Sequence, residues 1–255
     1  MPAGVTVEQG ALALDGEEPE VIDGYERYDN VTDATLSRYR EAYGQDVTKD
    51  QIFTYAYGVL HSPAYREAFG ADLKKMLPRL PMVSLRPDFI AFSEAGLALS
   101  NLHLGYESVE PWSLQITGEP ESQPLFHGAD RDLYRVEKMR FGRKGSTKDR
   151  STVHYNSRIT VTGIPDEAHE YTLGSRSAIE WILERYQLKT DKASGILNDP
   201  NTWSSDSGNS RHILDLLRRI VTVSVETVRI VRSLPEVEFL AVPATGADVE
   251  QLDVT

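Results

Sequence analysis

The sequence predicts an α+β fold with a helical N-terminal part, a central antiparallel β ribbon and C-terminal helices. Three observations predict it. Apolar residues recur at helical spacing from residue 32 to residue 102, short β-branched and aromatic runs follow between residues 112 and 162, and helical spacing returns after residue 175. With 255 residues, 40% of them hydrophobic, the chain can bury a core as one large domain or as two small subdomains.

Acidic residues are concentrated at the two ends of the chain, which account for the formal net charge of −12. Residues 1–30 contain eight acidic side chains and one arginine, and residues 236–255 contain five acidic side chains and no basic one. We expect four segments: an acidic extended lead-in (1–30), a helical subdomain (31–111), an α+β subdomain (112–235) and a disordered acidic tail (236–255). The body of the chain, residues 31–235, is neutral overall, which is compatible with a polyanionic partner.

The helical subdomain is expected to contain four helices. Gly44 is suited to end the first and Thr48 to cap the second. Pro63 opens a third helix that runs towards Leu77, and the fourth begins at Pro87. Three of these helices have clear apolar faces, formed by Leu36, Tyr39 and Tyr43, by Ile52, Phe53, Ala56, Val59 and Leu60, and by Phe92, Ala95, Leu99 and Leu102.

Residues 112–162 are expected to form strands. The strand-like runs are 112–118, 134–141 and a hairpin over 152–162, and the GRKG sequence at 142–145 is interpreted as a turn. Val153, Tyr155, Ile159 and Val161 share one face of the hairpin only if its loop has three residues, Asn156, Ser157 and Arg158. The opposite face then carries Thr152, His154, Thr160 and Thr162.

Two helices are expected in the C-terminal part. Ser175 is the predicted N-cap of the first, whose buried side consists of Ile179, Ile182, Leu183 and Tyr186. Helical spacing predicts the second over residues 211–233. A strand is the competing interpretation there, because valines alternate at positions 221, 223 and 225.

The body contains one concentration of basic residues, and it lies in the strand region. Residues 133–158 contain eight basic and two acidic side chains. Positive charge on one ribbon is typical of a polyanion site, although a solvated hairpin face has the same composition. With two lysines further along the chain, the candidate DNA-binding residues are Arg135, Lys138, Arg140, Arg143, Lys144, Lys148, Arg150, His154, Asn156, Arg158, Lys189 and Lys192.

Within this set we expect two roles. The cations at positions 143, 144, 148 and 150 lie in what is interpreted as a flexible Gly/Ser-containing connection, which suits contacts with phosphates. Asn156 and Arg158 lie in the tight hairpin loop, where their amide and guanidinium groups can pair with a purine edge.

Several chemistries are excluded. The absence of cysteine excludes disulfides and thiol catalysis, and no apolar run approaches the roughly 20 residues of a membrane span. No glycine-rich phosphate loop is present. His103 lies beside the apolar face of the fourth helix and is interpreted as a hydrogen-bonded residue at the edge of the core, because no second ligand stands at metal spacing. We expect a cytoplasmic chain without catalytic activity, cofactor or membrane contact.

A Mg²⁺-dependent nuclease is the alternative. Asp166, Gln187 and Lys189 fit the loose pattern in which a carboxylate and an amide hold the metal and a lysine lies near the attacking water. Against this interpretation, Asp166 has the position of a turn residue and Gln187 directly follows a helix. Residues 198–201, NDPN, resemble an amino-methyltransferase motif but lack its second proline and its aromatic residue.

Long blocks of the sequence carry a family resemblance. Among them are TKDQIFTYAYGVLHSPAYREAF, DLKKMLPRLP, FSEAGLALSNLHLGYE, YRVEKMRFG, ITVTGIP, SAIEWILERYQLKTDKASGILNDPN and LLRRIVTVSVETVRIV, which together cover most of residues 21–235. These blocks resemble the C-terminal specificity region of Type ISP restriction-modification enzymes. The resemblance implies target recognition on DNA in cis for catalytic parts that this chain lacks.

The implied parent enzyme is an ATP-dependent restriction endonuclease and adenine DNA methyltransferase that uses ATP, Mg²⁺ and AdoMet. The implied partners are double-stranded DNA and the methyltransferase and helicase-nuclease domains of the same or a companion polypeptide. The start at Met1 then leaves open a split or a truncated gene. A domain that couples its neighbours without contacting DNA is the structural alternative.

Overall fold

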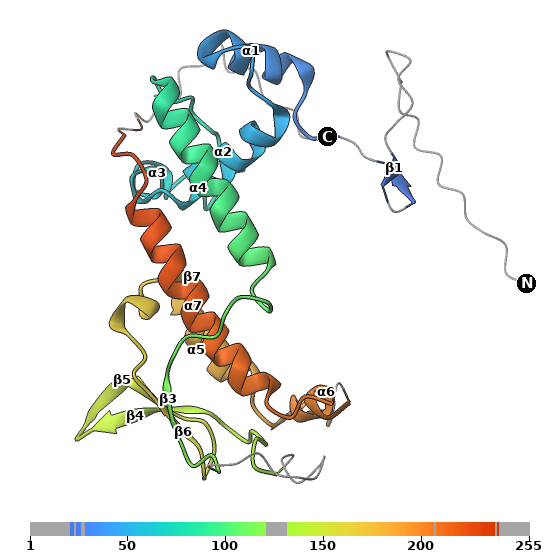
Figure 1. Cartoon of the computed structure of the whole chain (residues 1–255), viewed down its shortest axis with the longest axis vertical. Helices are drawn as coiled ribbons and strands as arrows, with labels where there is room; N and C mark the ends of the chain where they lie inside the picture. The colour runs from blue at the N-terminus through green and yellow to red at the C-terminus, as the bar shows by residue number, and fades with distance from the viewer. Residues whose placement is uncertain are drawn as a thin grey trace, which may run out of the picture.

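The computed structural model describes residues 21–22, 24–26, 29–120, 132–206, 208–237 and 239. Figure 1 shows helices gathered at one end of the molecule and a small sheet at the other, with one long helix, α7 (His212–Arg232), running between them. The α+β class, the helical N-terminal part, the antiparallel strands and the C-terminal helices are confirmed.

The N-terminal helices are α1 (Asp33–Tyr43), α2 (Lys49–His61), α3 (Pro63–Phe69) and α4 (Arg86–Leu104). Thr48 caps α2 as expected, and Gln51 completes a capping box with it. The third helix is shorter than predicted. It ends at Phe69, and hydrogen-bonded turns, not further helix, follow up to Met76.

An aromatic core holds these helices together. Tyr43 stacks on Phe89 with ring centroids 4.4 Å apart, and Tyr55 lies 5.2 Å from the same ring. Buried tyrosine hydroxyls need partners, and here they find them on the proline-rich stretch before α4. The hydroxyls of Tyr43, Tyr55 and Tyr65 donate to the carbonyls of Val83, Pro81 and Arg79 at 2.6, 2.6 and 2.7 Å.

Both predicted terminal segments contain described residues that are structured. In the lead-in, β1 (Val21–Ile22) pairs with β2 (Tyr25–Glu26), and Lys49 Nζ donates to Asp29 Oδ2 at 3.1 Å. In the predicted tail, Val237 and Phe239 pack against the aromatic core. Residues at the inner end of each predicted segment therefore take part in the fold. Residues 1–20 and 240–255 lie outside the described residues.

The sheet has the strand order β3-β6-β5-β4 and is antiparallel throughout. Its strands are β3 (Gln115–Thr117), β4 (Arg140–Lys144), β5 (Thr147–His154) and β6 (Thr160–Thr162). The predicted register of the second hairpin is confirmed, since Thr152 pairs with Thr162 and His154 with Thr160 around a three-residue loop. The face made of Val153, Tyr155, Ile159 and Val161 is fully buried.

The first hairpin differs from the prediction. The predicted strand over 134–141, ending at a GRKG turn, is wrong. Instead, β4 begins at Arg140 and continues through Gly142 to Lys144. The turn lies further on, where Lys144 pairs with Thr147 and leaves a two-residue loop. Gly145 occupies that loop with φ = 64°, a value that suits glycine in a tight hairpin turn.

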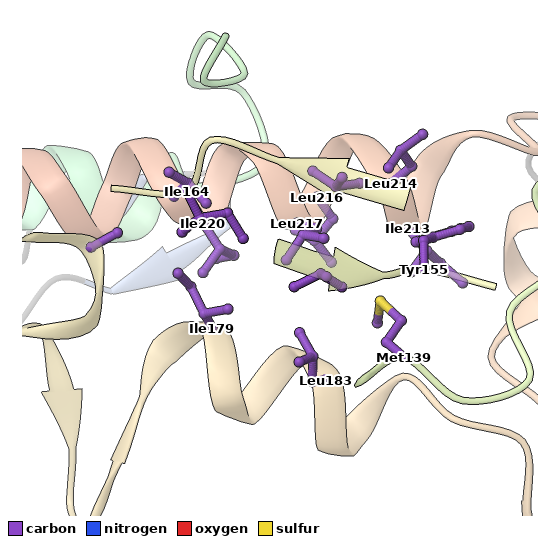
Figure 2. Close-up of a cluster of buried hydrophobic side chains, with 14 of the residues drawn as sticks. Met139, Tyr155, Ile164, Ile179, Leu183, Ile213, Leu214, Leu216, Leu217 and Ile220 are labelled. Carbon is purple, nitrogen blue, oxygen red and sulfur yellow. The ribbon is translucent and has the colours of Figure 1, made fainter. Parts of the chain in front are cut away.

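The second core lies between the sheet, α5 (Ala178–Arg185) and the first half of α7. Figure 2 shows Ile179 and Leu183 of α5 pointing towards Leu217 and Ile220 of α7. The predicted cap of α5 is wrong. Ser177 is the N-cap, with Glu180 closing a capping box, whereas Ser175 lies in the turn between β7 (Thr172–Leu173) and β8 (Arg176–Ser177).

The long helix α7 confirms helix over strand for residues 211–233. The alternating valines mislead because this helix is buried on several sides. Each valine lies about 200° around the axis from the next one, and yet Val221, Val223 and Val225 are all buried. The helix packs on α5, on the short 3₁₀ helix η1 (Asp166–His169) and on α4. It therefore links the two cores.

His103 makes a polar contact between the two parts. Its Nδ1 lies 2.8 Å from the Tyr57 hydroxyl on α2, its Nε2 lies 2.9 Å from Thr227 Oγ1 on α7, and its ring stacks on Tyr171 at 5.4 Å. This confirms the interpretation of His103 as a hydrogen-bonded residue at the core edge. Burial, with a smaller contribution from His61 5.5 Å away, lowers the pKa of His103 to about 4.

We expect acid to destabilise the folded chain through this residue. The unfolded chain binds the proton near the ordinary pKa of 6.5, and the folded chain only near 4, so the free energy of unfolding falls as the pH drops through that window. Because His103 is only partly buried, we expect a loss of about 1 to 2 kcal/mol between pH 7 and pH 5. Urea unfolding of the wild type and of His103→Gln at both pH values measures it. An equal pH dependence in the two proteins would contradict this account.

Candidate nucleic-acid interface

The outer face of the sheet is polar across all of its strands. One row of paired residues crosses it from Thr117 through Thr160 and His154 to Arg140. A second row runs from Gln115 through Thr162 to Thr152. The two rows are exposed or half-buried, and they carry hydroxyl, amide, imidazole and guanidinium groups. These groups can donate and accept hydrogen bonds at base edges and phosphates.

The β4–β5 hairpin continues from this face and carries most of the basic ribbon. Arg143 pairs with Lys148 across the hairpin, so these cations lie on paired strands and not on a flexible connection. A bulge separates the hairpin from the rest of the sheet, because the register shifts between Phe141 and Gly142. Asp149 holds the bulge by accepting a hydrogen bond from Ser151 Oγ at 2.6 Å, and this hydrogen bond lowers the pKa of its carboxyl.

Four of the ten predicted cations form ion pairs with carboxylates. Arg150 lies 2.8 Å and Lys148 3.8 Å from Glu180 Oε1, and Arg135 lies 3.0 Å from Asp199. Lys144 makes a longer pair of 3.5 Å with Asp149. Among the described residues, the predicted cations that form no ion pair are Lys138, Arg140, Arg143, Arg158, Lys189 and Lys192.

A cleft of about 500 Å³ lies between the β4–β5 hairpin and α5. One cation of the cleft, Arg176, is not among the candidate residues predicted from the sequence. Its guanidinium lies 5.3 Å from the ring of Trp181, and that of Arg185 lies 5.1 Å from the same ring. Arg176 pairs with Glu184. The charged residues lining the cleft are Lys138, Arg140, Lys148, Arg150, Arg176, Glu180 and Glu184.

Asn156 does not fit its predicted role as a base reader. Its amide nitrogen donates to the carbonyls of Leu133 at 2.8 Å and Arg135 at 3.0 Å. Its amide oxygen accepts from the backbone nitrogens of Arg158 at 2.9 Å and Ile159 at 2.7 Å. Both donors and both lone pairs are used, so Asn156 shapes the loop and has no hydrogen-bonding capacity left for a base.

Arg158 follows in this rigid loop, and its exposed side chain makes no ion pair among the described residues. The neighbouring β3 chain approaches its backbone closely. A Cβ added to Gly118 would collide with the Arg158 carbonyl, and Gly118 has φ = 93°. The guanidinium of Arg158 is therefore carried by fixed backbone while remaining free to bind.

The three residues of the nuclease alternative lie on separate elements. Asp166 begins η1, Gln187 donates to the Glu184 carbonyl at 2.8 Å, and Lys189 lies in the strand β9 (Lys189–Thr190). No hydrogen bond or ion pair joins any two of them. Within the part of the chain that the structure describes, no cluster of three or more His, Asp or Glu side chains is arranged to hold a metal ion.

Comparison with known proteins identifies relatives of this chain. A family model described as the Type ISP C-terminal specificity domain matches residues 7–216. Among solved structures, a nuclease-deletion mutant of the Type ISP restriction-modification enzyme LlaGI, in complex with a DNA substrate mimic, is 41% identical, with a TM-score of 0.62. That match covers 75% of this chain and 16% of LlaGI. No curated protein matches.

Two further structures show the same similarity. The ATP-dependent Type ISP restriction-modification enzyme LlaBIII bound to DNA is 33% identical over 80% of this chain and 12% of its own, with a TM-score of 0.65. The matched chain in the cryo-EM structure of a DrdV–DNA complex is 35% identical in sequence, with a TM-score of 0.68. That match covers 85% of this chain and 21% of the DrdV chain. This chain therefore spans a small part of each relative. Among the described residues, no helix is long and apolar enough to cross a membrane.

Proposed function

Because this chain belongs to the family of Type ISP C-terminal specificity domains, we propose that it recognises a sequence in duplex DNA through the outer face of its sheet. The observation that carries the proposal is the polar, exposed or half-buried row from Thr117 to Arg140, beside cations that have no carboxylate partner among the described residues. The relatives LlaGI, LlaBIII and DrdV were solved with DNA or a DNA mimic, which supports the same ligand here.

The cations and the polar groups have different roles in this proposal. Lys138, Arg140 and Arg143 bind phosphates, since a cation on a phosphate adds affinity without sequence information. Arg158 and the threonine, glutamine and histidine side chains of the sheet face read base edges, because a guanidinium carried on a fixed backbone can make a bidentate pair with guanine. Arg150, paired with Glu180, holds the hairpin against α5, and Arg135, paired with Asp199, holds the segment before β4 against residues 199–201.

The chain acts in this proposal as a targeting part without catalysis of its own. Its bound DNA positions the methyltransferase and helicase-nuclease domains of the same or a companion polypeptide, and ATP, Mg²⁺ and AdoMet belong to those domains. The small share of each relative that the chain spans supports such a division of labour.

The test is selection of random duplexes by the purified chain, followed by binding measurements across a salt series. We expect one enriched motif, and an affinity for it whose logarithm falls with the logarithm of salt by about 0.9 per phosphate contact. Arg158→Ala is expected to cost roughly 1 to 3 kcal/mol of binding on the enriched motif alone. Asn156→Ala is the matched variant in the same loop, and should instead lower the free energy of unfolding by roughly 1 to 3 kcal/mol.

Three results would contradict the proposal. Failure to retain duplex even at low salt would favour a domain that only couples its neighbours. Equal loss of enriched and scrambled duplexes in Arg158→Ala would remove its base-reading role. Mg²⁺-dependent cutting of duplex that is lost in Asp166→Asn would favour the nuclease alternative.

A further inference from the structure

A small hairpin formed by β9 and β10 (Leu197–Asn198) projects from the body beside the basic ribbon. Leu197 pairs with Thr190 and Asn198 with Lys189, and every residue from 189 to 198 is exposed. Two large aliphatic side chains lie near its tip, Ile196 at 67% and Leu197 at 57% exposed. Neither belongs to a core of the described chain.

The tip of this hairpin is rigid despite its exposure. The Asp191 carboxylate accepts from the backbone nitrogens of Ala193 at 3.0 Å and Ser194 at 2.8 Å, and from Ser194 Oγ at 2.9 Å. These hydrogen bonds lower the pKa of Asp191. Asp191 N donates to the Ile196 carbonyl at 2.9 Å, and Gly195 takes φ = 71°. The turn is thus ordered before any partner binds, which reduces the entropy lost on binding.

Both ends of the hairpin are fixed to the start of the basic ribbon. On the incoming side, Leu188 N donates to the Glu137 carbonyl at 2.8 Å. On the outgoing side, Asn201 accepts from Val136 N at 2.8 Å and donates to the Val136 carbonyl at 2.9 Å. The Arg135–Asp199 ion pair adds a contact of 3.0 Å. The position of the tip is therefore set relative to the proposed DNA-binding face.

The charges of the hairpin select its partner. Lys189 lies at the base of the hairpin and Lys192 in its turn, and neither forms an ion pair among the described residues. The one carboxylate in the segment, Asp191, is committed to the turn. Two aliphatic side chains are too few for a stable protein interface, which buries roughly 800 Å² on each partner. Apolar side chains combined with nearby cations are what proteins use to enter the minor groove of DNA and part the bases.

We propose that the 189–198 hairpin inserts Ile196 and Leu197 as an apolar wedge into the minor groove of the bound duplex, and that Lys189 and Lys192 bind the phosphates on either side. This inference rests on the proposed function and adds to it a specific DNA-deforming element. The wedge would unstack one base step, so the protein would select sequences in which that step is easily opened.

The experiment places 2-aminopurine, whose fluorescence rises on unstacking, at successive positions of the motif enriched by the full chain. We expect a severalfold rise at one step with the wild type and none with the double variant Ile196→Ala/Leu197→Ala. The double variant should bind the motif about tenfold or more weakly with an unchanged salt slope. Leu104→Ala, which truncates an 82% exposed leucine on α4, is the matched control and should behave as wild type.

The outcomes separate the wedge from the proposed function. Wild-type binding without a fluorescence change at any step, or a double variant that binds as tightly as wild type, overturns the wedge and leaves DNA recognition standing. A double variant that binds DNA normally but loses its association with a methyltransferase polypeptide would assign the hairpin to a protein interface and also overturn the wedge. Absence of duplex binding by the wild type overturns both proposals. Melting temperatures confirm that each variant is folded.

Discussion

Gly96→Ala is expected to destabilise the helical part of the chain by about 2 to 3 kcal/mol, the cost of overpacking a tight contact. The direction is informative, because alanine is the better helix former by about 1 kcal/mol and would stabilise an ordinary helical site. The site is not ordinary, since α2 and α4 make the most extensive contact between helices in the described structure.

The reason is the close approach of two backbones. A Cβ on Gly96 would collide with the Thr54 carbonyl, and a Cβ on Gly58 would collide with the Phe92 carbonyl. In each case the obstacle is backbone, which cannot rotate away as a side chain could. The helices would have to separate, and the contact between Thr54 Oγ1 and Ser93 Oγ, now 2.8 Å, would be lost.

Chemical denaturation followed by circular dichroism measures this effect. Ala98→Leu is the control, because Ala98 is exposed on the same helix and its enlargement should change the free energy of unfolding by less than about 0.5 kcal/mol. A Gly96→Ala protein as stable as the wild type, or more stable, would show that the two helices tolerate separation and would refute the account.

The sequence was sufficient where a periodic pattern had only one consistent arrangement. Val153, Tyr155, Ile159 and Val161 can all face the core in one register only, and a shift by one residue would have exposed the whole set. The structure has that register. Thr48 was likewise recognisable as a cap, because a threonine there directly precedes the apolar helical pattern.

Prediction failed where the deciding partner lies far away in the sequence. The amide of Asn156 binds carbonyls at Leu133 and Arg135, more than twenty residues earlier, and no local pattern reveals them. The glycines at 142 and 145 look alike in sequence. Gly142 lies inside β4, where a Cβ would meet Thr152 on β5, whereas Gly145 makes the turn. Only the paired strand distinguishes the two.

The same limitation affects the candidate interface. A count over residues 133–158 gives a strongly positive ribbon, but two of the compensating carboxylates, Glu180 and Asp199, come from beyond it. The structure therefore reduces the set of cations available to DNA and adds Arg176 to the cleft. That reduced set makes a sharper prediction than the charge count alone.

Neutralising Lys138, Arg140 and Arg143, which form no ion pair among the described residues, with glutamine should weaken duplex binding on the order of 100-fold near 0.1 M salt. If each holds one phosphate, the salt slope should also flatten by about 2.7, at roughly 0.9 per contact. Enriched and scrambled duplexes should lose affinity alike, because phosphates carry no sequence information. The control converts Arg38, Lys74 and Lys75 to glutamine, which removes the same charge from exposed positions in the helical part. Equal weakening by both triple variants would mean that net charge alone governs binding, and would contradict the phosphate contacts assigned to Lys138, Arg140 and Arg143.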